Sequence, residues 1–222
     1  MTFPEPGVGP ESTCIAPQRA GTCTLTSCKL GPIGDPAGGY DNFGTIYASV
    51  GTTTVPITYG GFGYPVVDFP APVSLAEGDT MSFRGGHGVG VPTFGVSAII
   101  PGVPALTSPA QPSGGGSTVI DTSSDLTVTW IPFSIGEMAF QLSGEGAQTD
   151  FTLSCSFDGS AGTGIVSQAL LSSMKAQPGS SRTKAFVTSQ LSVTTVVGGL
   201  TITTQSFQAA ASSQQTVPVS LE

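Results

Sequence analysis

The chain has 222 residues, with 14 acidic and 6 basic side chains, a formal net charge of −8 and a pI near 4.3. Charged residues make up only 9% of it, against about 25% in ordinary soluble domains. Six scattered basic residues form no continuous basic surface, which excludes nucleic-acid binding and adsorption to an anionic membrane. Abundant Gly (31) and Pro (18) interrupt helices, so we expect an all-β protein.

The two ends of the chain carry no membrane signal. No stretch is apolar for the roughly 20 residues that a transmembrane helix needs, so no membrane span is expected. Met1 leads into a Pro/Gly-rich segment that lacks a basic region and an apolar region, so it is not a signal peptide. We expect an export signal upstream in the natural protein. Residues 221–222 (Leu-Glu) resemble vector-derived residues that precede an affinity tag, and we set them outside the fold.

Four cysteines predict two disulfides and an extracytoplasmic location. Cys14, Cys23, Cys28 and Cys155 are an even set in a chain rich in Ser, Thr and Gly, as in proteins of oxidising compartments. The spacings of nine and five residues, with a single histidine, do not suit zinc. We therefore expect no metal centre and no cofactor.

Residues 22–30 read TCTLTSCKL and alternate as an extended strand. On such a strand Cys23 and Cys28 lie about 16 Å apart and point to opposite faces, so they cannot bridge each other. Two pairings remain. We favour Cys14–Cys23 with Cys28–Cys155, and the other choice is Cys14–Cys28 with Cys23–Cys155.

The first half of the chain predicts a tail and a β domain. Residues 1–31 read as an N-terminal tail with a disulfide-tied strand, and residues 32–103 as the first β domain, because Gly and Pro recur too often for helices. Residues 104–117 combine Pro, Gly and Ser without periodicity, which predicts a linker. The strands expected in the first domain cover residues 43–50, 53–59, 65–69, 80–83 and 91–100.

Residues 118–220 predict a second β domain. Three segments alternate apolar and polar residues as a half-buried antiparallel sheet requires: DLTVTWIPF, EMAFQLSG and DFTLSCSFDG. Trp130 lies on the apolar side of the first and belongs to the core. Two more strands are expected around Gly198-Gly199. One short helix is predicted at residues 167–175, with Ser167 as its cap and Leu170 and Met174 on one face.

The segment DLTVTWIP is similar to the second strand of fibronectin type III-like domains, in which a Trp anchors the sandwich. More broadly, the succession of a CTLTSC element, a β domain, a Pro-rich hinge and an LTVTW…LSCSF…GTG domain resembles a group of secreted bacterial lipoproteins. With the alternating patterns, the likeness predicts two antiparallel, Ig/fibronectin III-like β-sandwich domains, with one short helix in the second. It implies a location at the cell surface or in the periplasm, and no activity.

An aromatic loop is the first candidate site. All four tyrosines fall between residues 40 and 64, and TYGGFGYP groups Tyr59, Phe62 and Tyr64 among glycines. Such rings form an apolar platform with hydroxyl groups, on which sugars stack. The alternative is that the rings cover one end of the first domain. His87, in RGGHGVG, is the one histidine; it is a ligand-binding candidate or a solvated loop residue.

Carboxylates are the second group of candidates. Glu77 with Asp79, and Asp121 with Asp125, lie in oxygen-rich segments that could bind calcium. The alternative is that these side chains bond nearby backbone amides in turns. No catalytic residue is assigned, because no nucleophile elbow accompanies the histidine.

Three classes of function remain. The first is a non-enzymatic cell-surface or periplasmic binding module, structural or adhesive, with a polysaccharide or a surface protein as partner. The second is a carbohydrate-binding module that uses the aromatic loop. The third is a secreted hydrolase, which would have to use His87 or two carboxylates.

Overall fold

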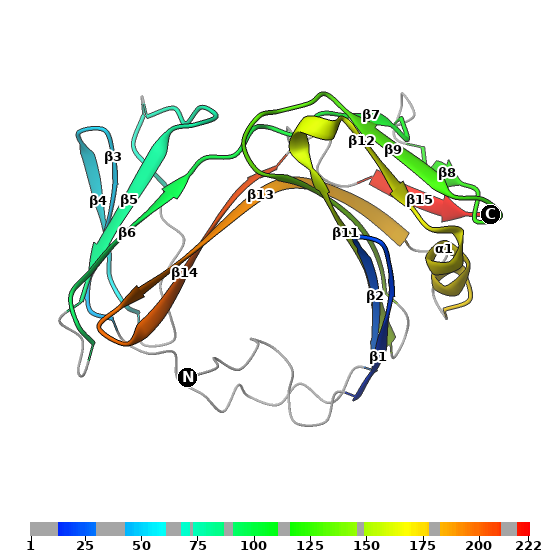
Figure 1. Ribbon diagram of the computed structural model, residues 1–222, viewed down its shortest axis with the longest axis horizontal. Coiled ribbons are helices and arrows are strands. Elements are labelled where there is room, and N and C mark those ends of the chain that lie inside the picture. Colours follow the sequence, from blue (N-terminus) through cyan, green and yellow to red (C-terminus); the bar gives the residue numbers. More distant parts are fainter. Residues whose placement is uncertain are drawn as a thin grey trace. The chain divides into compact units, whose positions relative to one another are not determined.

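The computed structural model describes residues 13–29, 43–60, 68–71, 73–86, 91–110, 116–145, 149–177, 183–209 and 217–222. The chain divides into two compact units. Unit 1 contains the described residues of 35–101 and 191–207, and unit 2 those of 8–34, 102–190 and 208–222. The described residues are mostly β-structure with one short α-helix, which confirms the predicted fold class in its general form (Figure 1).

Unit 2 is built from the helix, a smaller sheet and most of a larger sheet, of which residues 191–207 belong to unit 1. The larger sheet has the strand order β1-β2-β11-β10-β13-β15-β8, and β14 pairs with β13. Its strands are β1 (Thr13–Ala20), β2 (Cys23–Lys29), β8 (Thr118–Ile120), β10 (Glu137–Glu145), β11 (Thr149–Asp158), β13 (Thr183–Val197), β14 (Leu200–Ala209) and β15 (Val217–Leu221). The smaller sheet has the order β12-β9-β7, with β7 (Leu106–Ser108), β9 (Leu126–Trp130) and β12 (Thr163–Val166).

The core of unit 2 lies between these layers. The apolar sides of the alternating segments meet there, because period-two alternation places every second residue on one face of a strand. Met138, Phe140 and Leu142 of β10 are fully buried, as are Val128 of β9 and Val166 of β12. Trp130 lies in the same cluster, which confirms its predicted place in the core.

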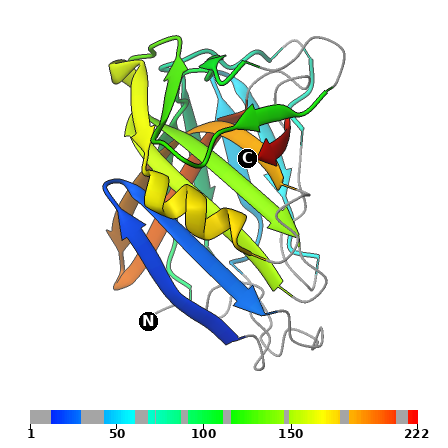
Figure 2. The ribbon, with the colours of Figure 1, turned by 90° about the vertical axis from the view of Figure 1, so that its right-hand side faces the viewer.

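The helix α1 (Gln168–Lys175) confirms the predicted one. Ser167 is its N-cap, and the Ser167 hydroxyl accepts a hydrogen bond from the amide of Ala169. Leu170, Leu171 and Met174 are buried in the core. Figure 2 shows the helix lying across β2, with β1 beside it, and α1 contacts both of these strands. The helix therefore closes the part of the sheet that the smaller sheet leaves uncovered.

The disulfides are Cys14–Cys28 and Cys23–Cys155. The favoured pairing, Cys14–Cys23 with Cys28–Cys155, is wrong, and the exclusion of a Cys23–Cys28 bond is confirmed. The reason is the alternation along β2. Cys23 faces the core directly opposite Cys155 of β11, whereas Cys28 points to the other face and lies opposite Cys14. Two disulfides are typical of oxidising, extracytoplasmic settings.

Unit 1 contains a four-stranded antiparallel sheet of order β4-β3-β5-β6. Its strands are β3 (Ile46–Val50), β4 (Thr53–Ile57), β5 (Thr80–Gly85) and β6 (Phe94–Ile99). The inward side chains include Ala48, Val96 and Ala98, which are buried. The distal half of the β13–β14 hairpin belongs to the same unit. Gly198 and Gly199 both adopt positive φ in its two-residue turn, a conformation that glycine takes without steric cost.

Several details differ from the prediction. β8 and β15 pair in parallel, so the structure is not purely antiparallel; almost one hundred residues separate the two strands, ample for the crossover that parallel pairing needs. Within the expected linker, Leu106–Ser108 form β7, because β9 offers a free edge. Asp68 and Phe69, the described part of the expected strand at 65–69, are not in a strand.

The last two residues belong to the fold, contrary to the expectation that they lie outside it. Leu221 ends β15 and packs against the core of unit 2. The amide of Glu222 donates to the carbonyl of Ile120, and the carbonyl of Glu222 accepts from the amide and hydroxyl of Thr122. These bonds continue the β8–β15 pairing beyond the strands.

Candidate functional site

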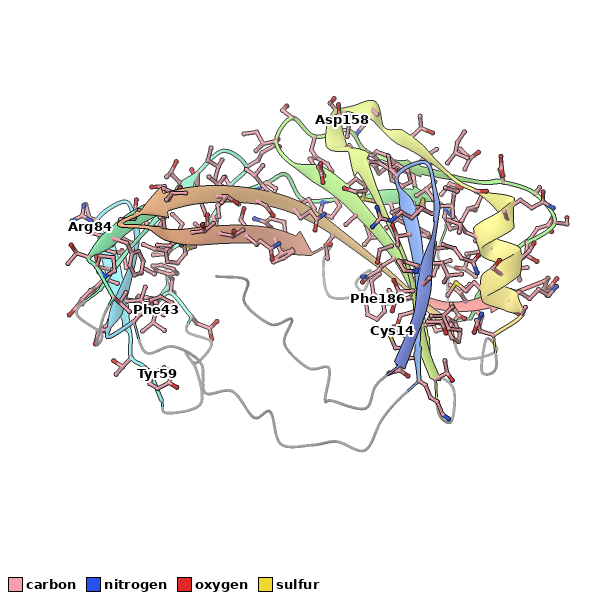
Figure 3. The ribbon with its side chains drawn as sticks, turned by 60° about the horizontal axis from the view of Figure 1, so that its bottom comes forward. Cys14, Phe43, Tyr59, Arg84, Asp158 and Phe186 are labelled. Atoms are coloured by element: carbon pink, nitrogen blue, oxygen red, sulfur yellow. A yellow bond between two sulfur atoms is a disulfide. The ribbon has the colours of Figure 1, made fainter. Side chains whose placement is uncertain are left out.

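The predicted aromatic loop is described only at its start. Tyr59 follows β4 and is half-buried. Phe62, Tyr64 and His87 lie outside the described residues. Figure 3 shows Tyr59 at one end of unit 1, beyond the strands of the sheet.

The predicted calcium carboxylates make local contacts. A side-chain oxygen of Asp79 accepts a hydrogen bond from the amide of Ala76, 2.7 Å away, in the turn that contains Glu77. Asp121 accepts from the amide of Ser123, and Asp125 accepts from the amide of Gln168 at the start of α1. Among the described residues, no group of three or more His, Cys, Asp or Glu side chains is placed to hold a metal ion. Asp79, Asp121 and Asp125 therefore act as the backbone-bonding side chains of turns and caps.

Asp158 is a further carboxylate with a local role. Its Oδ1 atom accepts hydrogen bonds from both the hydroxyl and the amide of Ser160, in the short 3-10 helix η1 (Gly159–Ala161). These two bonds hold the pKa of Asp158 below 3.8, because they stabilise the charged form. The pKa of Asp121 is lowered in the same way by Ser123.

We expect Ser160→Ala to raise the pKa of Asp158 toward 3.8, since the hydroxyl makes the larger contribution. In the wild type the folded pKa lies below the unfolded one. The stabilisation by Asp158 is therefore complete above pH 3.8 and is lost as the pH falls through the folded pKa. A carboxyl-carbon NMR titration measures the shift, with Asp121 as internal control. A wild-type Asp158 that titrates at 3.8 or above would contradict this account.

The outer face of the unit 1 sheet gathers a different set of side chains. Tyr47 of β3 lies directly opposite Pro56 of β4 on one side and Arg84 of β5 on the other, and Arg84 lies opposite Gly95 of β6. All four are exposed, and the Tyr47 side chain is 48% exposed. In Figure 3 Arg84 points away from the sheet, on the side opposite Phe43.

A row of hydroxyl groups runs beside this first row. Two positions along the strands, Ser49 lies opposite Thr54 and Ser82, and Ser82 lies opposite Ser97. The hydroxyls of Ser49 and Thr54 are 2.9 Å apart, and those of Ser82 and Ser97 are 3.4 Å apart, so each pair shares a hydrogen bond. Adjacent rows are about 7 Å apart, and four strands span about 14 Å. We call these eight residues the outer face of unit 1.

This outer face carries one charge. β3, β4, β5 and β6 contain no acidic residue, and Arg84 is their one basic residue. Asp79 immediately precedes β5, about 16 Å along the strand from Arg84. The Asp79 side chain is also bonded to the amide of Ala76. Among the described residues, no carboxylate forms an ion pair with Arg84, and the Arg84 side chain is exposed.

Sequence reasoning missed the outer face of unit 1. The alternation of β3 places Tyr47 and Ser49 on one side, which is a local signal. The pairing of Tyr47 with Arg84 joins residues 37 positions apart. No pattern within either strand specifies that pairing.

Comparison of the sequence with models of known protein families and with curated proteins found no match in either set. Within the described residues, no helix has the length and apolar character needed to cross a bilayer.

Proposed function

We propose that the protein is a non-enzymatic, extracytoplasmic binding module of structural or adhesive type, and that its partner is a polysaccharide. The observation that carries the proposal is the outer face of unit 1, where an exposed Tyr and an exposed Arg lie beside a row of hydroxyls. Aromatic rings stack on the apolar faces of sugars, and hydroxyl and guanidinium groups bond to sugar oxygens. These side chains lie on the exposed face of a sheet, which suits a polymer rather than a small molecule held in a pocket.

The sheet of unit 1 is a suitable support for a binding site. The outer face lies on regular strands, which position side chains more precisely than loops do. The buried inner side of the sheet anchors them, since Ala48, Val96 and Ala98 alternate with the outward residues of β3 and β6. The likeness to secreted bacterial lipoproteins supports placing the module at the cell surface or in the periplasm. Two facing sheets around Trp130 support a fibronectin type III-like sandwich for unit 2.

A glycan array with the labelled protein tests the proposal. We expect binding to at least one class of polysaccharide, and we expect Ser49→Ala/Ser82→Ala to weaken it about fivefold, because two hydrogen-bonding hydroxyls are lost. The matched control is Thr127→Ala/Thr163→Ala, which removes two exposed hydroxyls from the smaller sheet of unit 2. The control should bind as the wild type does. Absence of binding to every glycan, or equal weakening by both double variants, would overturn the proposal.

A further inference from the structure

The outer face of unit 1 carries a positive charge at Arg84, and this charge indicates which class of polysaccharide it binds. Arg84 is an exposed guanidinium without a described acidic partner, in a sheet whose strands carry no other charge. A guanidinium presents a planar fork of donors that matches a carboxylate with two parallel hydrogen bonds. A chain of net charge −8 that exposes one such cation on this face, with no ion pair to a described carboxylate, is complementary to a ligand with an acidic group at that point.

We infer that the outer face of unit 1 binds a carboxylated polysaccharide, a polymer of uronic acid type. The inference rests on the proposed function and names the ligand for the same face. The Arg84 guanidinium binds the sugar carboxylate, and the Tyr47 ring stacks on the apolar face of the adjacent sugar. Paired residues on neighbouring strands have Cβ atoms about 5 Å apart, so the two side chains serve adjoining parts of one polymer.

Other residues of the outer face are placed to contact the same polymer. The hydroxyls of Ser82 and Ser97 line the second row, within reach of sugar hydroxyls on the same strand of polymer. Gly95 lies opposite Arg84 and a Cβ atom there would meet open space, so the surface beside the guanidinium is unobstructed.

We expect each protein molecule to bind its segment of the polymer weakly, because a single exposed ion pair contributes little free energy. An exposed ion pair contributes about 0–1 kcal/mol. High affinity therefore requires several repeats of the polymer to engage several copies of the protein, as in multivalent binding. The charge-dependent part of the affinity should also fall with salt, since exposed charges are screened.

Affinity electrophoresis with two forms of one polymer tests the inference. Polygalacturonate carries a carboxylate on each sugar, and its fully methyl-esterified form has the same backbone without the charge. We expect the wild type to bind polygalacturonate about fivefold more tightly than the ester at low salt, and to lose this preference at high salt. Arg84→Gln should abolish the preference, so that the variant binds the two polymers equally. Tyr47→Ala should weaken binding to both polymers.

Two further variants serve as controls for this experiment. Lys184→Gln removes an exposed cation from β13 in unit 2, so it should leave the preference intact. Gly95→Val places a side chain in open space, so it should fold normally and still weaken binding to both polymers by covering the surface beside Arg84. Circular dichroism checks that every variant is folded.

The outcomes separate this inference from the proposed function. Equal binding of the two polymers by the wild type, or a preference that survives Arg84→Gln, would overturn the inference. Binding that is confined to neutral glycans would also overturn the inference, but it would agree with the proposed function as a polysaccharide-binding module. A protein that binds no polysaccharide would overturn both.

Discussion

Removal of the Cys23–Cys155 disulfide, by Cys23→Ala/Cys155→Ala, should lower the free energy of unfolding by about 5 kcal/mol. The bond closes a loop of 132 residues, and the chain-entropy account assigns a loop of that length about this stabilisation. It also joins β2 to β11 inside the core, where the two cysteines are 1% and 2% exposed. Urea denaturation followed by circular dichroism measures the loss.

The second disulfide is the matched control. Cys14–Cys28 closes a loop of only 14 residues, so Cys14→Ala/Cys28→Ala should cost about 3 kcal/mol or less. Cys14 is exposed, so mild reductant should cleave this bond first and leave Cys23–Cys155 intact. Alkylation of the released thiols and mass spectrometry give the order. Equal losses in the two double variants, or release of Cys23 and Cys155 first, would show that burial and loop length do not govern these bonds.

Replacement of Trp130 by Ala should destabilise the protein by about 3–5 kcal/mol, the usual cost of deleting a large aromatic side chain from a core. Trp130 is 3% exposed, and its ring stacks on Phe157 with centroids 5.7 Å apart. The indole Nε1 atom donates a buried hydrogen bond of 2.8 Å to the carbonyl of Gly159. Three contributions are therefore lost together: apolar burial, ring contact and the hydrogen bond. Thermal and urea unfolding measure the change.

Two neighbouring variants separate these contributions. Trp130→Phe keeps an aromatic ring and loses the hydrogen bond, and it should cost about 1–2 kcal/mol. The Gly159 carbonyl retains a second partner in the amide of Phe133, which limits the cost. Ile131→Ala changes the adjacent residue on the opposite face, where the side chain is 59% exposed, so it should stay within about 0.5 kcal/mol. A large effect at Ile131, or none at Trp130, would contradict the assigned core.

The stability predictions and the binding predictions concern different units of the protein. The stability predictions concern the core and disulfides of unit 2, whereas the proposed binding face lies wholly on unit 1. Variants of Arg84 and Tyr47 remove exposed side chains, so they should change binding without lowering stability by more than about 0.5 kcal/mol. This separation lets a loss of binding be distinguished from a loss of folding.

Much of the local structure was contained in the sequence. Alternation placed Trp130 in the core, and the Ser167 cap with Leu170 and Met174 defined the helix. The same alternation excluded a Cys23–Cys28 bond. It also placed Cys23 on the face of Leu25 and Cys28 on the other face, but it did not specify the partner of either cysteine. These are properties of a single strand or helix, and the spacing of apolar residues decides them before any partner is chosen.

Only the tertiary structure decided which strands meet. The pairing of β3 with β5 that joins Tyr47 to Arg84, the parallel pairing of β8 with β15, and the division of β13 and β14 between the two units all link residues distant in sequence. A strand's period of two specifies its faces but not its neighbour. The choice of neighbour and register depends on which edges remain free and which apolar faces must be buried together, so it belongs to the folded chain as a whole.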